Sequence, residues 1–198
     1  MRHSFLRAAA AAVALLPTAA LAHTGHGEAH GFVHGFSHPL GGLDHVLAMV
    51  TVGIFAWQLG GRALWLLPAT FVTVMAVGGT SAMAGVPAPF VELGIAASVI
   101  VLGAIVALSV KAPVAIAMGI VGAFALFHGH AHGTEMPLDT SGFGYATGFM
   151  LATALLHAAG IAAGFLIGRV ADGYGRLAYR AAGSAVALAG VAILVQVI

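Results

Sequence analysis

The sequence contains no cysteine and few charged residues. Only 7% of its 198 residues are Asp, Glu, Lys or Arg, whereas soluble proteins carry about 25%. The absence of cysteine excludes disulfides, thiolate nucleophiles and cysteine-bound metals. The single lysine, Lys111, lies in no glycine-rich phosphate-binding loop, so no ATPase is expected. A formal net charge of +1 gives no indication of nucleic-acid binding.

Apolar residues make up 61% of the chain, and the mean hydropathy is +1.05. This composition predicts an all-α membrane protein. A helix needs about 20 apolar residues to cross a bilayer, and six segments of about that length are separated by Gly- and Pro-containing breaks. The sequence therefore predicts a bundle of six transmembrane helices, at residues 41–60, 63–84, 90–110, 113–131, 143–168 and 180–198.

Residues 1–22 have the features of a secretory signal peptide. Two arginines precede the apolar stretch from Ala8 to Leu16, and Ala20-Leu21-Ala22 is a small-x-small cleavage site. We expect cleavage before His23, because the apolar stretch is short for a membrane span; the alternative is an uncleaved N-terminal anchor. Residues 23–40 are then a His-rich periplasmic tail, of which residues 23–38 are too irregular for a helix prediction, and residues 41–198 form the transmembrane domain.

The basic residues predict the orientation of the bundle. Outside the signal peptide there are five, and all fall in three alternate loops that the positive-inside rule assigns to the cytoplasm: Arg62, Lys111, Arg169, Arg176 and Arg180. Both termini of the mature chain are then outside the cytoplasmic (inner) membrane of a bacterium. The C-terminal end of the first predicted segment is inside, so its beginning, like the end of the fourth segment, is outside.

Two clusters of histidine and carboxylate lie at those outer ends. The first is His38-Pro39-x4-Asp44-His45, and the second runs from Phe127 to Glu135. Ionisable groups within membrane segments are costly and therefore indicate function. Imidazole and carboxylate together are ligands of divalent transition metals. We expect one shared metal site, with His45 and His128 within about 10 Å of each other, since ligand bonds are about 2.0–2.2 Å long.

Helical spacing divides the second cluster into two faces. His128, His132 and Glu135 share one face because they are four and three residues apart, whereas His130 points elsewhere. In the first cluster, Pro39 favours a helix start, which would place His38 at the cap.

Asp44 and His45 diverge by about 100° on a helix, so one is expected to bind metal and the other to support it. The spacing alone leaves open which of the two is the ligand.

Other ionisable residues allow two interpretations each. His157, in the middle of the fifth segment, is either a metal ligand on the pathway or a packed core residue. Glu92 is either on the pathway or a carboxylate that stabilises a helix start. The tail histidines form either a solvated loop or an auxiliary site that captures metal: His23, His26, His30 and His34. Glycines at intervals of four, including Gly160 and Gly164, favour close packing of helices.

The two histidine motifs resemble those of the HupE/UreJ family of nickel permeases. The matching runs are His-Pro-x4-Asp-His, from His38 to His45, and Phe-His-Gly-x-Ala-His-Gly-x-Glu, from Phe127 to Glu135. The resemblance covers the whole chain. It implies a permease that moves Ni2+, or Co2+ in some relatives, into the cytoplasm for hydrogenase or urease, with the metal as substrate and no bound cofactor. It also implies transport-critical roles for six residues: His38, Asp44, His45, His128, His132 and Glu135.

Two other functions are compatible with metal ligands in a membrane. The first is an intramembrane zinc hydrolase, in which Asp44 or Glu135 would activate a metal-bound water. It would need an open cleft for its substrate, whereas a permease needs a polar path that continues toward the cytoplasm. The second is a metal sensor, which the absence of a signalling domain disfavours. The sequence therefore favours a permease rather than an enzyme.

Overall fold

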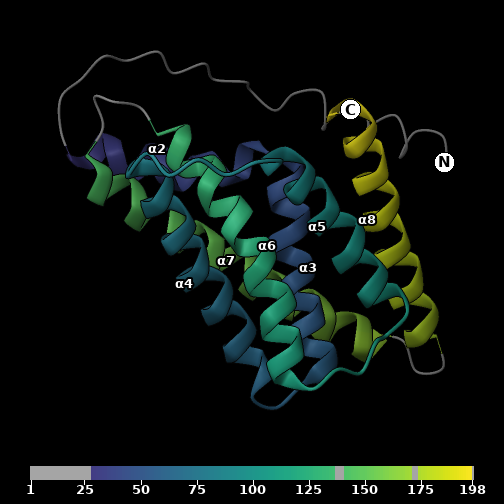
Figure 1. Ribbon diagram of the computed structural model, residues 1–198. Helices are drawn as coiled ribbons and strands as arrows, with labels where there is room; N and C mark the ends of the chain where they lie inside the picture. The colour runs from purple at the N-terminus through teal and green to yellow at the C-terminus, as the bar shows by residue number, and fades with distance from the viewer. Residues whose placement is uncertain (1–27, 137–140, 171–173, 198) are drawn as a thin grey trace, which may run out of the picture.

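The computed structural model describes residues 28–136, 141–170 and 174–197, with no side chains placed for 28–30 and 170. The described residues form helices and no strand (Figure 1). The helices are α2 (Glu28–Gly41), α3 (Leu43–Leu59), α4 (Ala63–Met83), α5 (Val91–Ala107), α6 (Val114–Thr134), α7 (Gly142–Val170) and α8 (Gly175–Val197). The predicted signal peptide lies outside the described residues.

Helices α3 to α8 occupy the six predicted apolar segments, so the predicted all-helical class and the helix positions are confirmed. Four of them, α4, α6, α7 and α8, are each long and apolar enough to cross a membrane. A fifth candidate is α2 with α3, which are bent by 84° relative to each other, and α5 is a shorter apolar helix. The chain is therefore a multi-pass membrane protein, while the six-span topology and the positions of its termini stay predictions.

Helix α2 corrects the prediction that residues 23–38 are irregular, because Glu28–Gly41 is helical. The buried residues Gly31, Gly35 and Pro39 recur every four positions, which places them on one face of α2. At Gly35 the backbone of α2 is so close to Tyr145 of α7 that a Cβ would overlap the Tyr145 carbonyl. Glycines that suggest a loop in water thus allow close packing here.

Pro39 also differs from its predicted place. It lies inside α2, two residues before that helix ends, and the next helix begins at Leu43 after the N-cap residue Gly42. His38 is consequently in the last turn of α2 rather than at the start of the first span.

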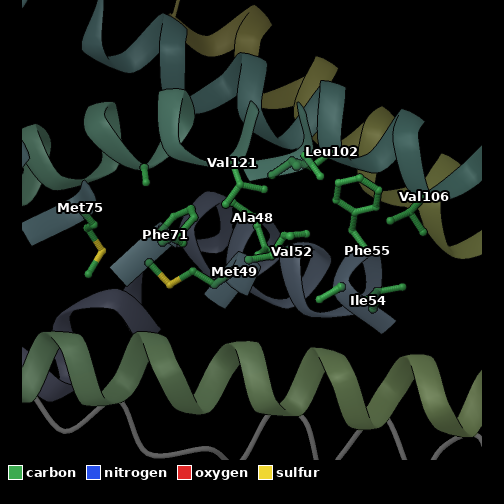
Figure 2. Packing of buried hydrophobic residues seen from close by; sticks show 14 of the residues in the cluster. Ala48, Met49, Val52, Ile54, Phe55, Phe71, Met75, Leu102, Val106 and Val121 are labelled. Atoms are coloured by element: carbon green, nitrogen blue, oxygen red, sulfur yellow. The ribbon is translucent and has the colours of Figure 1, made fainter. Parts of the chain in front are cut away.

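Helix α3 lies at the centre of the bundle and contacts all the other described helices. Its residues Met49, Val52 and Phe55 are fully buried, and they pack with Phe71 of α4 and Leu102 of α5 (Figure 2). Because every other described helix contacts α3, packing fixes the position of its first turn, which carries Asp44 and His45, relative to its neighbours.

Glycines bring α3 and α7 together, as predicted for Gly160 and Gly164. A Cβ at Gly160 would overlap the carbonyl of Val50, and one at Gly164 would be 2.8 Å from Cβ of Trp57. The packing interpretation of this glycine series is therefore confirmed for these two positions.

The predicted cytoplasmic loops meet at one end of the bundle. Lys111 from the α5–α6 link and Arg176 and Arg180 from α8 line one cavity together with the end of α3. The links between α3 and α4 and between α5 and α6 lie at the lower end in Figure 1, and α2 lies at the upper end. The structure thus separates basic residues from the histidine motifs, as the predicted orientation requires.

Candidate metal centre

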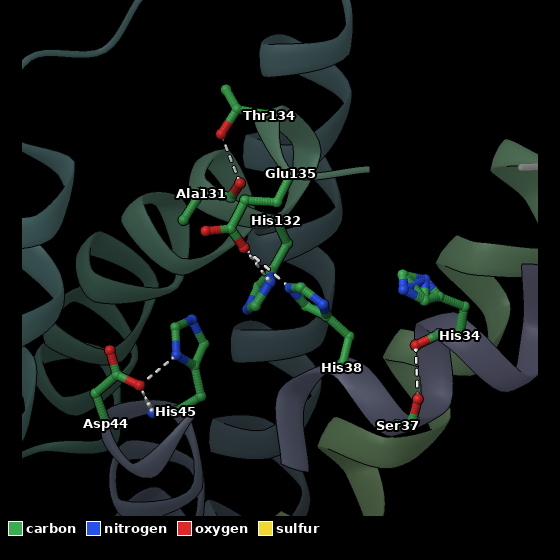
Figure 3. A network of polar contacts seen from close by, with 9 residues as sticks. All are labelled: His34, Ser37, His38, Asp44, His45, Ala131, His132, Thr134 and Glu135. Atoms are coloured by element: carbon green, nitrogen blue, oxygen red, sulfur yellow. Dashed lines mark hydrogen bonds and ion pairs between the residues drawn. The ribbon is translucent and has the colours of Figure 1, made fainter. Parts of the chain in front are cut away.

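Three helices bring the two histidine motifs together at the upper end of the bundle. The last turn of α2 supplies His38, the first turn of α3 supplies Asp44 and His45, and the end of α6 supplies His128 and His132. Glu135 is the C-cap residue of α6. Figure 3 shows His38, His45 and His132 turned toward one another from these helices.

The rings are close enough for a metal centre. The ring centroids of His45 and His128 are 4.7 Å apart, those of His45 and His132 are 4.2 Å apart, and those of His38 and His132 are 4.9 Å apart. The prediction that His45 and His128 lie within about 10 Å of each other is therefore confirmed. Metal binding by these residues remains a prediction.

A close approach between α4 and α6 sets the position of the second motif. A Cβ at Gly129 would overlap the carbonyl of Met75, so α6 lies directly on the α4 backbone beside His128. His130, on another face, lies with its Nε2 2.8 Å from the carbonyl of Val86, to which it donates a hydrogen bond. This contact turns His130 away from the other histidines, as the spacing predicted.

Asp44 orients the His45 ring. Its Oδ1 accepts hydrogen bonds from the backbone N–H of His45, at 2.8 Å, and from Nδ1 of the same ring, at 2.7 Å. Because Nδ1 carries the proton, the buried Nε2 is left with a lone pair and no hydrogen-bond partner among the described residues. A carboxylate that holds one ring nitrogen while the other binds metal is a common arrangement. The geometry thus favours His45 as the candidate ligand and Asp44 as the residue that supports it.

Ser98 of α5 orients His128 by a hydrogen bond to Nε2, whereas Asp44 holds His45 by Nδ1. The Ser98 hydroxyl donates its one proton to the carbonyl of Ile95 at 2.6 Å, so it accepts from Nε2 of His128 at 2.9 Å. The free nitrogen of His128 is therefore Nδ1, which is buried without a partner among the described residues. The motifs gave no indication of Ser98; its signal was a lone hydroxyl within an apolar segment.

His132 is held by no hydrogen bond at either nitrogen within the described residues, although its side chain is buried. Its Nδ1 lies 3.6 Å from Oε2 of Glu135, and the same oxygen accepts a hydrogen bond from Nε2 of His38 at 2.9 Å. Each of these three residues offers one atom that could bind a metal, and the three atoms lie within 4.8 Å of one another. They form the one group of this kind that the described residues contain.

The charge of Glu135 suits a cation. The His132 ring, and then that of His38, hold its pKa at about 2 against the opposing effect of partial burial. The carboxylate is therefore ionised at neutral pH.

Exposure decreases from the outer residues inward. The side chains of Glu135 and His38 are 52% and 26% exposed, and those of His132 and His45 are 5% and 10% exposed. His128 is fully buried. The candidate ligands therefore form a series that runs from the solvent-exposed surface into the interior of the bundle.

His157 lies deeper and apart from this cluster. Its buried ring contacts Phe71 with centroids 5.0 Å apart, and Phe71 lies 5.6 Å from the His128 ring on the same measure. Neither His157 nitrogen has a partner among the described residues, and a buried polar group without one costs about 1–3 kcal/mol. Glu92 is exposed in the first turn of α5, a position that favours a negative charge.

The predicted capture histidines are only partly described. His34 is exposed on α2, with its ring centroid 6.0 Å from that of His38, so it is part of a helix beside the centre rather than of an irregular tail. His30 belongs to the same helix, but its side chain is not placed. His23 and His26 lie outside the described residues.

The helices and the cluster define a multi-pass membrane protein with a candidate site for a divalent metal. The family described as HupE / UreJ protein matches residues 11–193. Protein HupE from Rhizobium leguminosarum bv. viciae is 47% identical over 196 residues, which cover 98% of this chain and 100% of the relative. No solved structure matches the chain.

The chain belongs to the HupE/UreJ family, a family of nickel and cobalt transporters. The resemblance noted from the two motifs is therefore confirmed. The members of this family are transporters rather than enzymes, which favours a metal permease over an intramembrane zinc hydrolase.

Proposed function

We propose that this protein imports Ni2+, with Co2+ as the alternative substrate, across the bacterial inner membrane for hydrogenase or urease maturation. The observation that carries the proposal is that the buried rings of His45 on α3 and His128 on α6 lie 4.7 Å apart between centroids, each with one nitrogen that has no hydrogen-bond partner among the described residues. The ligand nitrogens of His45 and His128 are free because Asp44 and Ser98 occupy the opposite ring nitrogens. Neutral imidazole nitrogens with a carboxylate suit Ni2+ and Co2+.

The ion first meets the outer group of His38, His132 and Glu135. These residues are partly exposed, and the carboxylate supplies the negative charge that draws a divalent cation from water. One carboxylate and no thiolate hold the ion weakly enough for it to leave again, which transport requires.

His132 transfers the ion to the inner residues. Its Nδ1 faces Glu135, and its ring also lies against that of His45, so one side chain borders both groups. Because neither nitrogen is held by another partner among the described residues, the ring is free to bind on either side. The inner group of His45, His128 and His132 then receives the ion.

Transport is best tested by uptake of radioactive nickel and cobalt into bacterial cells that lack their own nickel importers. Cells that produce the protein should accumulate nickel above vector controls, and an uncoupler shows whether uptake needs the proton gradient. Cobalt competes if both ions use the site. Uptake equal to the vector control for both metals would refute the proposal.

Ser98→Ala is expected to raise the half-saturation concentration for nickel uptake by roughly 10- to 100-fold, since the partners that orient a ligating histidine affect affinity by that amount. The measurement is the concentration dependence of uptake at equal protein level. Ser81→Ala is the matched control, because the one hydrogen bond of that hydroxyl among the described residues is to the carbonyl of Gly78. Identical half-saturation for both variants would show that Ser98 does not orient a ligand.

His157 is proposed to relay the ion beyond Phe71 toward the cytoplasmic end. His157→Ala should reduce the maximum rate of nickel uptake while the protein level in membranes stays normal. His157→Phe separates transport from packing, because it keeps a ring of similar size and removes both nitrogens. If His157→Phe transports normally, the residue only packs in the core.

His23, His26, His30 and His34 are proposed to raise the local ion concentration outside the membrane. Replacing all four with Ala should raise the half-saturation concentration and leave the maximum rate unchanged, since the permeation site remains intact. His34→Ala alone tests the position on α2 beside His38. A lower maximum rate in the fourfold variant would instead make these residues part of the permeation site.

A further inference from the structure

The cavity lined by Lys111, Arg176 and Arg180 has a volume of about 920 Å3 and lies at the end of the bundle opposite the metal centre. It is formed where the end of α3, the α5–α6 link, the end of α7 and the beginning of α8 meet. Its lining includes Trp57, Gln58, Ser109, Lys111, Arg176 and Arg180. None of these residues takes part in the proposed path for metal, so the cavity needs a separate explanation.

The cavity brings together three cations. Lys111 comes from the link before α6, whereas Arg176 and Arg180 are one turn apart on α8. All three are exposed, and none forms an ion pair with another described residue. The carboxylates whose side chains are described belong to the α3 start, the α5 start and the α6 end. Asp172, before α8, lies outside the described residues. An anion is therefore the ligand class that this lining favours.

Apolar and aromatic side chains border the cations. Trp57, Tyr174 and Tyr179 line the cavity, as does Leu177, which is 62% exposed. Leu108, next to the lining residue Ser109, is 71% exposed. Tryptophan and tyrosine concentrate at the level of lipid headgroups. The anionic part of a ligand bound here would thus contact the cations, while the apolar part of the same ligand would extend along the helices.

Gln58 adds an acceptor to this lining. Its side-chain amide donates to the carbonyl of Val106 at 3.0 Å, and its buried Oε1 has no hydrogen-bond partner among the described residues. A buried acceptor without a donor is unfavourable. A hydroxyl group on the anionic ligand would supply that donor.

We propose that this cavity binds the headgroup of an anionic phospholipid. The phosphodiester lies among Lys111, Arg176 and Arg180, a headgroup hydroxyl donates to Gln58, and the acyl chains follow the apolar side chains beside it. Basic pockets between membrane helices on the cytoplasmic side recognise such headgroups. A soluble acidic protein would not require the exposed leucines, and free phosphate would not require the aromatic border.

The test uses the full-length protein, purified in detergent and stripped of lipid. Native mass spectrometry measures binding of phosphatidylglycerol, phosphatidylcholine and inorganic phosphate. Phosphatidylglycerol should bind most tightly. Replacing Lys111, Arg176 and Arg180 together with Gln should weaken its binding by about 100-fold, at roughly fivefold for each basic residue. Arg62→Gln is the matched control, because Arg62 is a cation in a link at the same end but outside the cavity lining.

Two further variants keep the result decisive. If the triple variant does not fold, Arg176→Gln alone should weaken binding by roughly fivefold. Gln58→Leu should weaken the binding of phosphatidylglycerol several-fold. It should leave the binding of phosphatidic acid unchanged, because that headgroup lacks glycerol hydroxyls. Equal binding by wild type and a folded triple variant would overturn the proposal, as would equal affinity for phosphatidylcholine. Binding of inorganic phosphate as tight as that of phosphatidylglycerol would overturn the lipid assignment.

Discussion

Nickel uptake by the His128→Ala variant is expected to fall to the vector level at every external concentration. His128 is fully buried, and its Nδ1 is one of the nitrogens that the structure leaves free for an ion. Without it the inner group loses a ligand that no exposed residue can replace, and no increase in nickel concentration restores the path. Uptake of radioactive nickel from low to saturating concentration measures this loss of maximum rate.

His130→Ala is the matched control for that experiment. The two histidines are two residues apart on α6, but His130 donates to the carbonyl of Val86 instead of facing the cluster. Its loss removes one hydrogen bond, worth about 1 kcal/mol of folding free energy, and should leave the maximum rate close to wild type. Saturable uptake by His128→Ala would remove His128 from the permeation site.

Gly129→Val is expected to prevent stable folding of the bundle. The Cβ of the new side chain would overlap the carbonyl of Met75, so α4 and α6 would have to separate along their contact. Overpacking in a close-packed interior costs about 1–3 kcal/mol, and a clash with backbone on a neighbouring helix belongs at or above the upper end of that range. The yield of monodisperse protein in detergent and its unfolding temperature report the effect.

Gly119→Ala is the corresponding control on the same helix. A Cβ at Gly119 meets no atom within 4 Å, and alanine favours a helix over glycine by about 0.5–1 kcal/mol. That variant should be as stable as wild type or slightly more stable. A Gly129→Val protein with normal yield and unfolding temperature would contradict the packing described for α4 and α6.

The sequence was sufficient to predict the helices that carry long apolar runs. Hydropathy and length alone located α4, α6, α7 and α8 to within a few residues, because lipid requires continuous hydrogen-bonded helix in each of them. The prediction failed at α2, whose glycines and histidines resemble a polar loop. What stabilises α2 is contact with α7 through Gly35, which a propensity estimate cannot include. The four-residue spacing of Gly31, Gly35 and Pro39 was the available signal.

The candidate site was predictable in its residues but not in their roles. The positive-inside rule placed the beginning of α3 and the end of α6 on one side, which is why His45 and His128 were expected to be neighbours. Whether Asp44 or His45 was the ligand could not be decided from spacing, because it depends on which ring nitrogen the carboxylate occupies. Ser98 comes from a third helix, and only the tertiary structure brings it to His128.

The glycine contacts also divide the candidate ligands between two closely packed units of helices. Backbone contacts join α2 and α3 to α7, as at Gly35 and Gly160, and they separately join α6 to α4, as at Gly129. The first unit carries His38 and His45, and the second carries His128, His132 and Glu135. An ion bound by residues of both units would therefore be a removable cross-link between them. Its arrival and departure would change how firmly the two units are held together.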